Sequence, residues 1–361
     1  MEILFSDFES FLLYSGVILS SFIMSIVYCK CRLKTFATKI LFSILVVFPL
    51  VFLFAFRDKS VGTDFHFYYD LSVRFLANSY TLSDLPYMYG EKSFNFMLFV
   101  LSKMSFGSVN FMFALLGFLI FLPAFWGITS LNNYVNAPVA WLFYLSMFYF
   151  LSYNITRQVL SVSIMSISFK YLFERKIWKC FVIGLFACLF HYSSIVYLLV
   201  FSLIFCFNIK TVASEVVLYI VVLLFLFVFF VVISSLLGYG GYLNNQNDIS
   251  YFLQSCIILL PFYYYVRCVE PNKKLQLSFL HFIPLCILTS TVSMFSDVAI
   301  RLLVSLQFLP VIVGSRIVSK RYLGLCFYVF LYFLGYQYLY IYVLHGSCEV
   351  FPYIFSLDNG F

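Results

Sequence analysis

The chain has 361 residues and a formal net charge of +7; 63% of its residues are hydrophobic, 22% are aromatic and only 10% are charged. Soluble domains carry about 25% charged residues, so this composition excludes a water-soluble fold and indicates that lipid is the solvent. The ten cysteines are scattered and give no zinc-ligand spacing. We therefore expect no metal, no cofactor and no nucleic-acid partner.

Apolar runs predict an all-α polytopic membrane protein, residues 1–361 forming a single integral membrane domain. The runs occur at residues 11–28, 40–56, 110–130, 137–154, 156–173, 180–209, 212–237, 251–266, 275–294, 298–314 and 322–343. The first run lacks the basic start and cleavage site of a signal peptide, so we expect it to be retained. We divide the 180–209 run into two short helices hinged at "FHYSS" (190–194), which gives about twelve spans.

Basic clusters predict the orientation of these helices, because Lys and Arg concentrate in cytoplasmic loops. The clusters are "KCRLKTFATK" (30–39), "ERKIWK" (174–179), Lys210, "RCVEPNKK" (267–274) and "SRIVSKR" (315–321). With the hinge at 190–194, every cluster falls inside and both termini fall outside.

Three segments are expected on the outer face. Residues 57–93 form a long outer loop, and 94–106, "FNFMLFVLSKMSF", is too short and polar to cross the membrane easily. We place 94–106 as a re-entrant or interfacial helix beneath that loop. Residues 238–250, "GYGGYLNNQNDIS", form a second outer loop.

Arginines at outward-facing span ends are the main functional signal. Arg57 follows the second span, Arg157 opens the fifth, and Arg301 lies at the top of the eleventh. The planar guanidinium grips phosphate with two parallel hydrogen bonds and stays charged. If the three arginine side chains converge, they predict an anionic lipid headgroup as the ligand. The simpler alternative is that each arginine extends to the membrane interface, where its charge reaches water.

Two further stretches carry candidate residues. In "NITRQVLSVSI" (154–164), Arg157 and Gln158 lie at a helix start, where free N–H groups and the dipole also favour an anion. In "LFHYSSIVYLL" (189–199), His191 lies at the expected hinge, where it could be a base or an oxyanion donor, or simply bond a backbone carbonyl.

The stretch "FRDKSVGTDFHFYYD" (56–70) is rich in ionisable groups. Gly62 allows a tight turn before Asp64, which is the best carboxylate candidate but could equally cap a helix starting near Phe65. Tyr68 and Tyr69 could stack on a sugar or belong to an aromatic belt. His66 and Arg74 complete the candidate substrate-binding residues.

These motifs carry a resemblance to a known family. "FRDKSVGTDFHFYYD" resembles the R…GTD…Y signature of the EpsG family, which is related in role to Wzy-type O-antigen polymerases. "YNITRQVLSVSI", "KCFVIGLFACLFHYSS" and the C-terminal "FPYIFSL" resemble that family's N…RQ stretch, its H-S hinge and its closing segment, in the same order.

The resemblance implies a glycosyltransferase C-like membrane enzyme of the bacterial inner membrane with its active site facing the periplasm. It would join undecaprenyl-pyrophosphate-linked oligosaccharide repeat units into O-antigen, capsule or exopolysaccharide, aided by a chain-length regulator. By position, it points to Arg57, Asp64, Arg157, Gln158 and His191. We expect the arginines to bind pyrophosphate, Asp64 to be the preferred base and His191 the donor to the leaving phosphate.

Two other classes of function fit the residues alone. A lipid-oligosaccharide flippase or carrier would show internal repeats and midplane charges, whereas here the halves show no repeat and the charges cluster at the outer face. An O-antigen ligase-like transferase or an acyltransferase would share the arginine–histidine chemistry.

Overall fold

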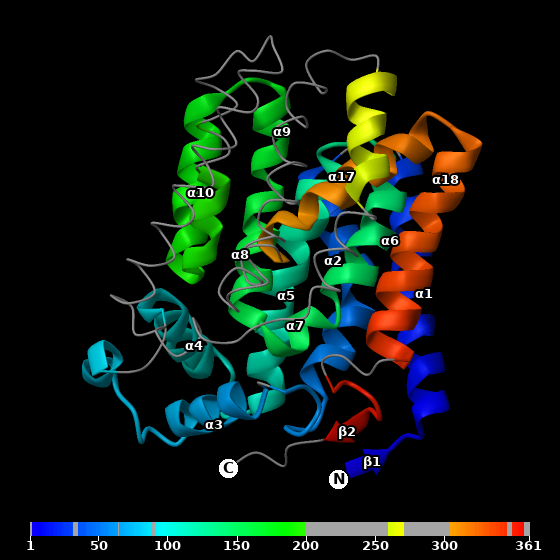
Figure 1. The fold of residues 1–361 in the computed structure, drawn as a ribbon. Helices are drawn as coiled ribbons and strands as arrows, with labels where there is room; N and C mark the ends of the chain where they lie inside the picture. The colour runs from blue at the N-terminus through cyan, green and yellow to red at the C-terminus, as the bar shows by residue number, and fades with distance from the viewer. Residues whose placement is uncertain are drawn as a thin grey trace, which may run out of the picture.

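The computed structural model describes residues 2–31, 35–63, 65–87, 91–198, 202, 259–270, 304–344 and 349–356. Within these ranges the chain is almost entirely helical (Figure 1). The elements are β1 Glu2–Leu4, α1 Asp7–Lys30, α2 Phe36–Ala55, α3 Phe65–Leu76, η1 Leu82–Tyr87, α4 Lys92–Met104, α5 Val109–Thr129, α6 Ala137–Phe148, α7 Leu151–Asn154, α8 Thr156–Ser166, α9 Ser168–Phe173, α10 Ile177–Phe190, η2 Tyr192–Ser194, η4 Tyr265–Val269, α17 Phe308–Ser319, α18 Leu323–Phe330, η5 Leu331–Leu344 and β2 Ile354–Ser356.

The membrane character predicted from composition is supported by the described helices. Four of them are long and apolar enough to cross a membrane: α1, α2, α5, and α18 continued by η5. Shorter apolar helices are 137–148, 177–190 and 304–319. The expected count of twelve spans is not confirmed, and the runs at 212–237 and 275–294 lie outside the described residues.

Local sequence sets the starts of several helices. Ser6 caps α1 and forms a capping box with Glu9, whose carboxylate accepts from the Ser6 backbone N–H at 2.8 Å. Ser108 caps α5 and Asn136 caps α6, each through its side-chain oxygen. Such caps satisfy backbone donors that the helix itself leaves unpaired.

Helix α5 is the centre of the described bundle and positions α8. It packs against α2 on one side and α8 on the other. At Gly127 the two backbones approach so closely that an added Cβ would lie 2.0 Å from Oγ of Ser166. Small residues permit this close approach of helices in lipid, and it fixes the place of α8 in the bundle.

The ends of the chain meet at one end of the bundle. Strand β1 pairs antiparallel with β2, with Glu2 opposite Ser356. Arg57, just beyond α2, forms a backbone bridge with Phe355. Figure 1 shows this small sheet at the same end as α3 and α4, whereas the α9–α10 and α17–α18 turns lie at the opposite end.

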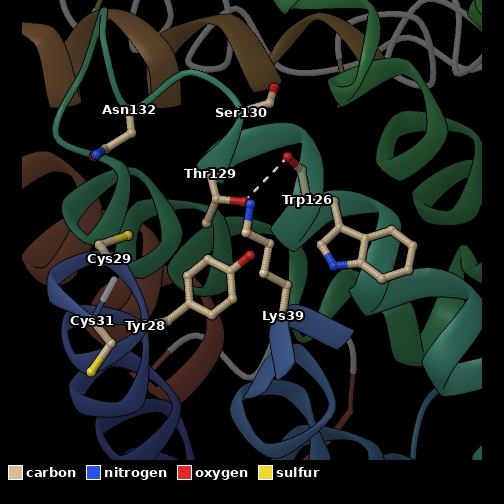
Figure 2. Close-up of a pocket in the computed structure, with 8 residues that line it drawn as sticks. All are labelled: Tyr28, Cys29, Cys31, Lys39, Trp126, Thr129, Ser130 and Asn132. Atoms are coloured by element: carbon tan, nitrogen blue, oxygen red, sulfur yellow. Dashed lines mark hydrogen bonds between the residues drawn. The ribbon is translucent and has the colours of Figure 1, made fainter. Parts of the chain in front are cut away.

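The opposite end gathers basic residues from the predicted cytoplasmic clusters. A pocket of about 450 Å³ lies there between α1, α2 and α5. Figure 2 shows the Lys39 side chain pointing toward Thr129, with Tyr28 on one side of it and Trp126 on the other. An adjoining pocket is lined by residues that include Lys30 and Arg321. Basic residues of two of the predicted cytoplasmic clusters therefore lie together at this end of the bundle, and the orientation in the membrane stays a prediction.

The segment expected as an outer loop contains regular structure. Residues 57–93 include helix α3 and the turn η1. Helix α3 starts at Phe65, as the sequence predicts, and buries Phe65, Tyr68, Ser72 and Phe75. The expected short helix at 94–106 is present as α4, Lys92–Met104. Helices α3 and α4 pack on each other and on α5, which brings this segment over the end of the bundle.

Candidate active site

The sequence around Arg157 breaks the helical path and places this side chain at a helix start. Helix α7 ends at Asn154, Ile155 leaves helical geometry (φ −90°, ψ 50°), and α8 begins at Thr156. Arg157 therefore lies in the first turn of α8, as predicted. Its Nε donates to the Tyr68 hydroxyl of α3 at 3.2 Å. The guanidinium is held beside α8's positive end, which favours an anionic partner.

That anionic partner is Glu91, the residue immediately before α4. One carboxylate oxygen accepts a hydrogen bond from Nη1 of Arg157. The other carboxylate oxygen lies 2.7 Å from Nδ1 of His191. The Glu91 side chain is only 1% exposed, compared with 9% for His191 and 15% for Arg157. One buried carboxylate thus joins a guanidinium and an imidazole from two other helices.

Electrostatics favour the ionised form of Glu91. Burial alone would raise the pKa of this carboxyl group, because it disfavours the charged form. The hydrogen bond and charge of His191 and the charge of Arg157 outweigh burial and lower its pKa to about 2. At neutral pH the site therefore contains a fixed negative charge between two nitrogen donors.

His191 occupies the hinge that the sequence predicts. Helix α10 ends at Phe190, and His191 is extended (φ −157°, ψ 123°) before the single turn η2. Ser161 of α8 donates to the Ala187 carbonyl of α10 at 2.8 Å and hydrogen-bonds Ser194 of η2. These bonds fasten the hinge to α8, so His191 and Arg157 are held in fixed relation. Figure 1 shows α4 lying beside the lower end of α10.

Gln158 supports the same hinge through Ser305. Its Nε2 donates to Oγ of Ser305 at 3.0 Å. Ser305 also hydrogen-bonds Ser193 of η2 at 2.9 Å, and its carbonyl accepts from the Tyr197 hydroxyl. Gln158 is 1% exposed. Its position fits a support for the hinge better than direct contact with a substrate.

Arg57 lies in a different environment from Arg157. It is 2% exposed, and its guanidinium carbon lies 3.5 Å from the ring centroid of Phe65 and 4.2 Å from those of Phe54 and Tyr153. Among the described residues its guanidinium nitrogens have no hydrogen-bond acceptor in good geometry. Burial lowers its pKa to about 10, so it stays charged at neutral pH.

Arg57 and Arg157 are linked by two short segments rather than by a shared ligand. Phe65 and Tyr68 lie one turn apart on α3; the first packs on Arg57 and the second bonds Arg157. Tyr153 packs on Arg57 and lies four residues before Arg157. Phe65 and Tyr68 are neighbours on one helix face, and α7 leads directly through Ile155 into the start of α8. The aromatic enclosure of Arg57 is therefore connected to the position of Arg157 through both segments.

Comparison with known proteins identifies the family. The family model described as EpsG family matches residues 39–355, which is most of the chain. The chain belongs to the EpsG family. No curated protein and no solved structure matches it. EpsG family proteins are Wzy-type polymerases, and the assignment supports a membrane polysaccharide polymerase in general.

The EpsG family match includes every predicted site residue, but the structure distributes them. It joins Arg157 and His191 through Glu91, with Tyr68 bonded to Arg157 directly, and it separates Arg57 in its aromatic enclosure. On α3, His66 is exposed and Tyr69 is half-buried. Arg74 is exposed and donates to the Tyr80 hydroxyl at 2.6 Å. Asp64 and Arg301 lie outside the described residues, and their roles stay predictions.

Glu91 is the residue that sequence reasoning missed in this EpsG family protein. It lies in "GEKSFNF", directly before a short apolar helix, where an acid is ordinarily a helix-start residue. A useful signal was available: an arginine and a histidine expected in one membrane site require a counter-charge. Only the tertiary structure shows which acid supplies it.

Proposed function

We propose that this protein joins undecaprenyl-pyrophosphate-linked oligosaccharide repeat units into surface polysaccharide at the periplasmic face of the bacterial inner membrane. The observation that carries the proposal is the buried Glu91 carboxylate shared by Arg157 and His191. Such a cluster supplies both a phosphate-binding cation and a base in one place. The site lies at the bundle end opposite the basic clusters, which agrees with an outward-facing site under the positive-inside rule.

Arg157 is the proposed phosphate ligand. Its side chain is the most exposed of the three, and Tyr68 holds its Nε. Guanidinium groups bind phosphate with two parallel hydrogen bonds. The negative charge on the pyrophosphate grows as the glycosidic bond breaks, and one preorganised donor in a low-dielectric site is worth about 3–4 kcal/mol of transition-state stabilisation.

His191 is the proposed base. Its Nδ1 is engaged by Glu91, so Nε2 is the nitrogen that faces the reaction. A carboxylate on one ring nitrogen fixes the tautomer and stabilises the imidazolium that forms when the other nitrogen takes a proton. Asp64, expected to be the base with His191 as donor to the leaving phosphate, remains a second candidate.

The proposed reaction is a glycosyl transfer with a pyrophosphate leaving group. A hydroxyl oxygen at the non-reducing end of a new lipid-linked repeat unit forms a bond to the anomeric carbon of the growing glycan. The bond from that carbon to the pyrophosphate oxygen breaks, and its electron pair stays with the lipid pyrophosphate. The hydroxyl proton passes to Nε2 of His191. No soluble nucleotide sugar is required.

Arg57 is assigned a supporting role rather than direct contact with substrate. Its enclosure by three aromatic rings and its 2% exposure leave the guanidinium remote from bulk solvent. Through Phe65 and Tyr153 it stabilises the two segments that hold Tyr68 and Arg157. Both arginines are therefore needed for activity, but for different reasons.

The test is the surface-glycan ladder of a deletion strain complemented with variants. Arg157→Ala and His191→Ala should reduce long-chain polysaccharide to single repeat units while the protein still reaches the membrane. Arg157→Lys should rescue only partly, because the planar fork is lost. Arg321→Ala, at the opposite end of the bundle, is the matched control and should give a full ladder. A full-length ladder from both site variants would refute the proposal.

The same strain separates polymerisation from the two alternatives. A polymerase deletion should leave single lipid-linked units on the periplasmic face. Accumulation on the cytoplasmic face would indicate a flippase. Long lipid-linked polymer that fails to reach its final acceptor would indicate a ligase.

A further inference from the structure

Glu91 occupies the atoms that the proposed function needs for its substrate. Its carboxylate takes a hydrogen bond from Arg157, and carboxylate and phosphate are the two groups that a guanidinium binds in the same way. A phosphate that binds through Nη1 of Arg157 therefore competes with Glu91 for that nitrogen. One Glu91 oxygen bonds Arg157 and the other bonds His191, so the competition takes place among these three side chains.

The position of Glu91 indicates that its side chain is directed to this task rather than to the start of α4. It is the N-cap residue of α4, yet its side chain makes no capping hydrogen bond. Its backbone carbonyl accepts the first hydrogen bond of the helix, from the Asn95 N–H at 3.1 Å, and its side chain is left for other contacts. The carboxylate is turned toward α8 and the hinge, where it lies 1% exposed between the Arg157 guanidinium and the His191 imidazole.

The three side chains differ in access. Arg157 is 15% exposed and Glu91 1%, so an incoming diphosphate reaches the guanidinium before the carboxylate. The Tyr68 hydroxyl bonds Nε of Arg157, whereas Glu91 bonds Nη1. Arg157 can therefore exchange the partner of its terminal nitrogen while Tyr68 keeps hold of the rest of the group.

We propose that Glu91 is a positioning residue that occupies Arg157 in the empty site, yields it to the donor diphosphate, and then serves His191 alone. The inference rests on the proposed function. After the exchange, Arg157 neutralises the donor, and the full negative charge of Glu91 acts on the imidazole. The base is thereby activated only when a donor is bound.

The consequence is a split between binding and catalysis. Removing the charge of Glu91 frees Arg157 for diphosphate, and it deprives His191 of its orienting carboxylate. Binding should therefore improve while the rate falls. A carboxylate with a purely structural role would weaken both, because loss of the buried partner would disorder Arg157 and His191 together.

The experiment measures farnesyl diphosphate binding and polymerisation with the purified full chain in detergent micelles. Glu91→Gln should bind the probe about tenfold more tightly than wild type, the scale of one charge-assisted hydrogen bond. Its kcat should fall about a hundredfold, the usual contribution of a positioned base. Glu174→Gln, which removes an exposed ion-pair carboxylate at the opposite end, is the matched control and should change neither value.

A second variant guards against misfolding. Glu91→Asp keeps the charge but is too short to reach both partners, so it should bind the probe more tightly than wild type and recover part of the rate lost in Glu91→Gln. Binding equal to or weaker than wild type in the folded variants overturns the inference while leaving the proposed function intact. A wild-type protein that does not bind the diphosphate overturns the proposed function itself.

Discussion

Replacing Arg157 with alanine should destabilise the folded protein through Glu91. The substitution leaves a carboxylate that is 1% exposed and keeps its hydrogen bond to His191 but loses the guanidinium. Against the opposing effect of burial, the pKa of Glu91 is lowered to about 2 by the hydrogen bond and charge of His191 and then by the charge of Arg157. Because His191 stays, the loss of Arg157 removes only part of the stabilisation of this charge. Removing one member of a buried ion pair typically costs about 3–5 kcal/mol. We expect a loss near the lower figure.

The double variant Arg157→Ala/Glu91→Gln tests where this loss comes from. Once the buried charge is gone, the unfolding free energy should return to within about 1.5 kcal/mol of wild type. Polymerisation should stay absent, because the phosphate ligand is still missing. The assay is denaturant unfolding in mixed micelles, combined with the glycan ladder. A double variant no more stable than Arg157→Ala would refute the claim that the Glu91 charge carries the cost.

Three further outcomes are expected. The pKa of Glu91 is lowered in the folded state, so the contribution of this carboxylate to stability is complete above about pH 4.5 and is lost as the pH falls toward about 2. The thermal unfolding midpoint of wild type should therefore fall more steeply on acidification than that of Glu91→Gln. Arg57→Ala should lower the yield of folded protein, because it empties a buried aromatic enclosure. Arg57→Met should restore most of that yield by refilling the space, but it should restore the length of the polysaccharide less, because the charge is missing. Gly62→Ala should cost about 1–3 kcal/mol, measured by denaturant unfolding, because Gly62 has φ +103° and an added Cβ would lie 2.7 Å from Oδ1 of Asn154; an unchanged unfolding curve would contradict that reasoning.

Local sequence was sufficient to predict the membrane class and several helix boundaries of this protein. Composition alone requires a membrane protein, because 63% hydrophobic residues cannot be buried in a water-soluble fold. The break at Ile155 and the hinge at His191 follow from polar residues interrupting apolar runs, and the structure has both. The start of α3 at Phe65 and the first-turn position of Arg157 were likewise expected.

Local sequence patterns did not predict which charged side chains pair with each other. Arg57 and Arg157 look alike in sequence, each at an expected outer span end. The structure surrounds the first with Phe54, Phe65 and Tyr153, and gives the second a carboxylate. Which charged groups come together depends on the packing of helices that are far apart in the sequence. Hydrophobic periodicity, which extends over a few residues, does not predict this packing.

The sequence by itself determined that the protein lies in a membrane, that it is helical and that it belongs to the EpsG family. The tertiary structure alone decided that Glu91, 66 residues from Arg157 and 100 from His191, lies between them. The physical reason is that hydropathy and capping act over a few residues, whereas a buried ion cluster is assembled from distant helices. Such a cluster forms only where their packing removes water from all of its members at once.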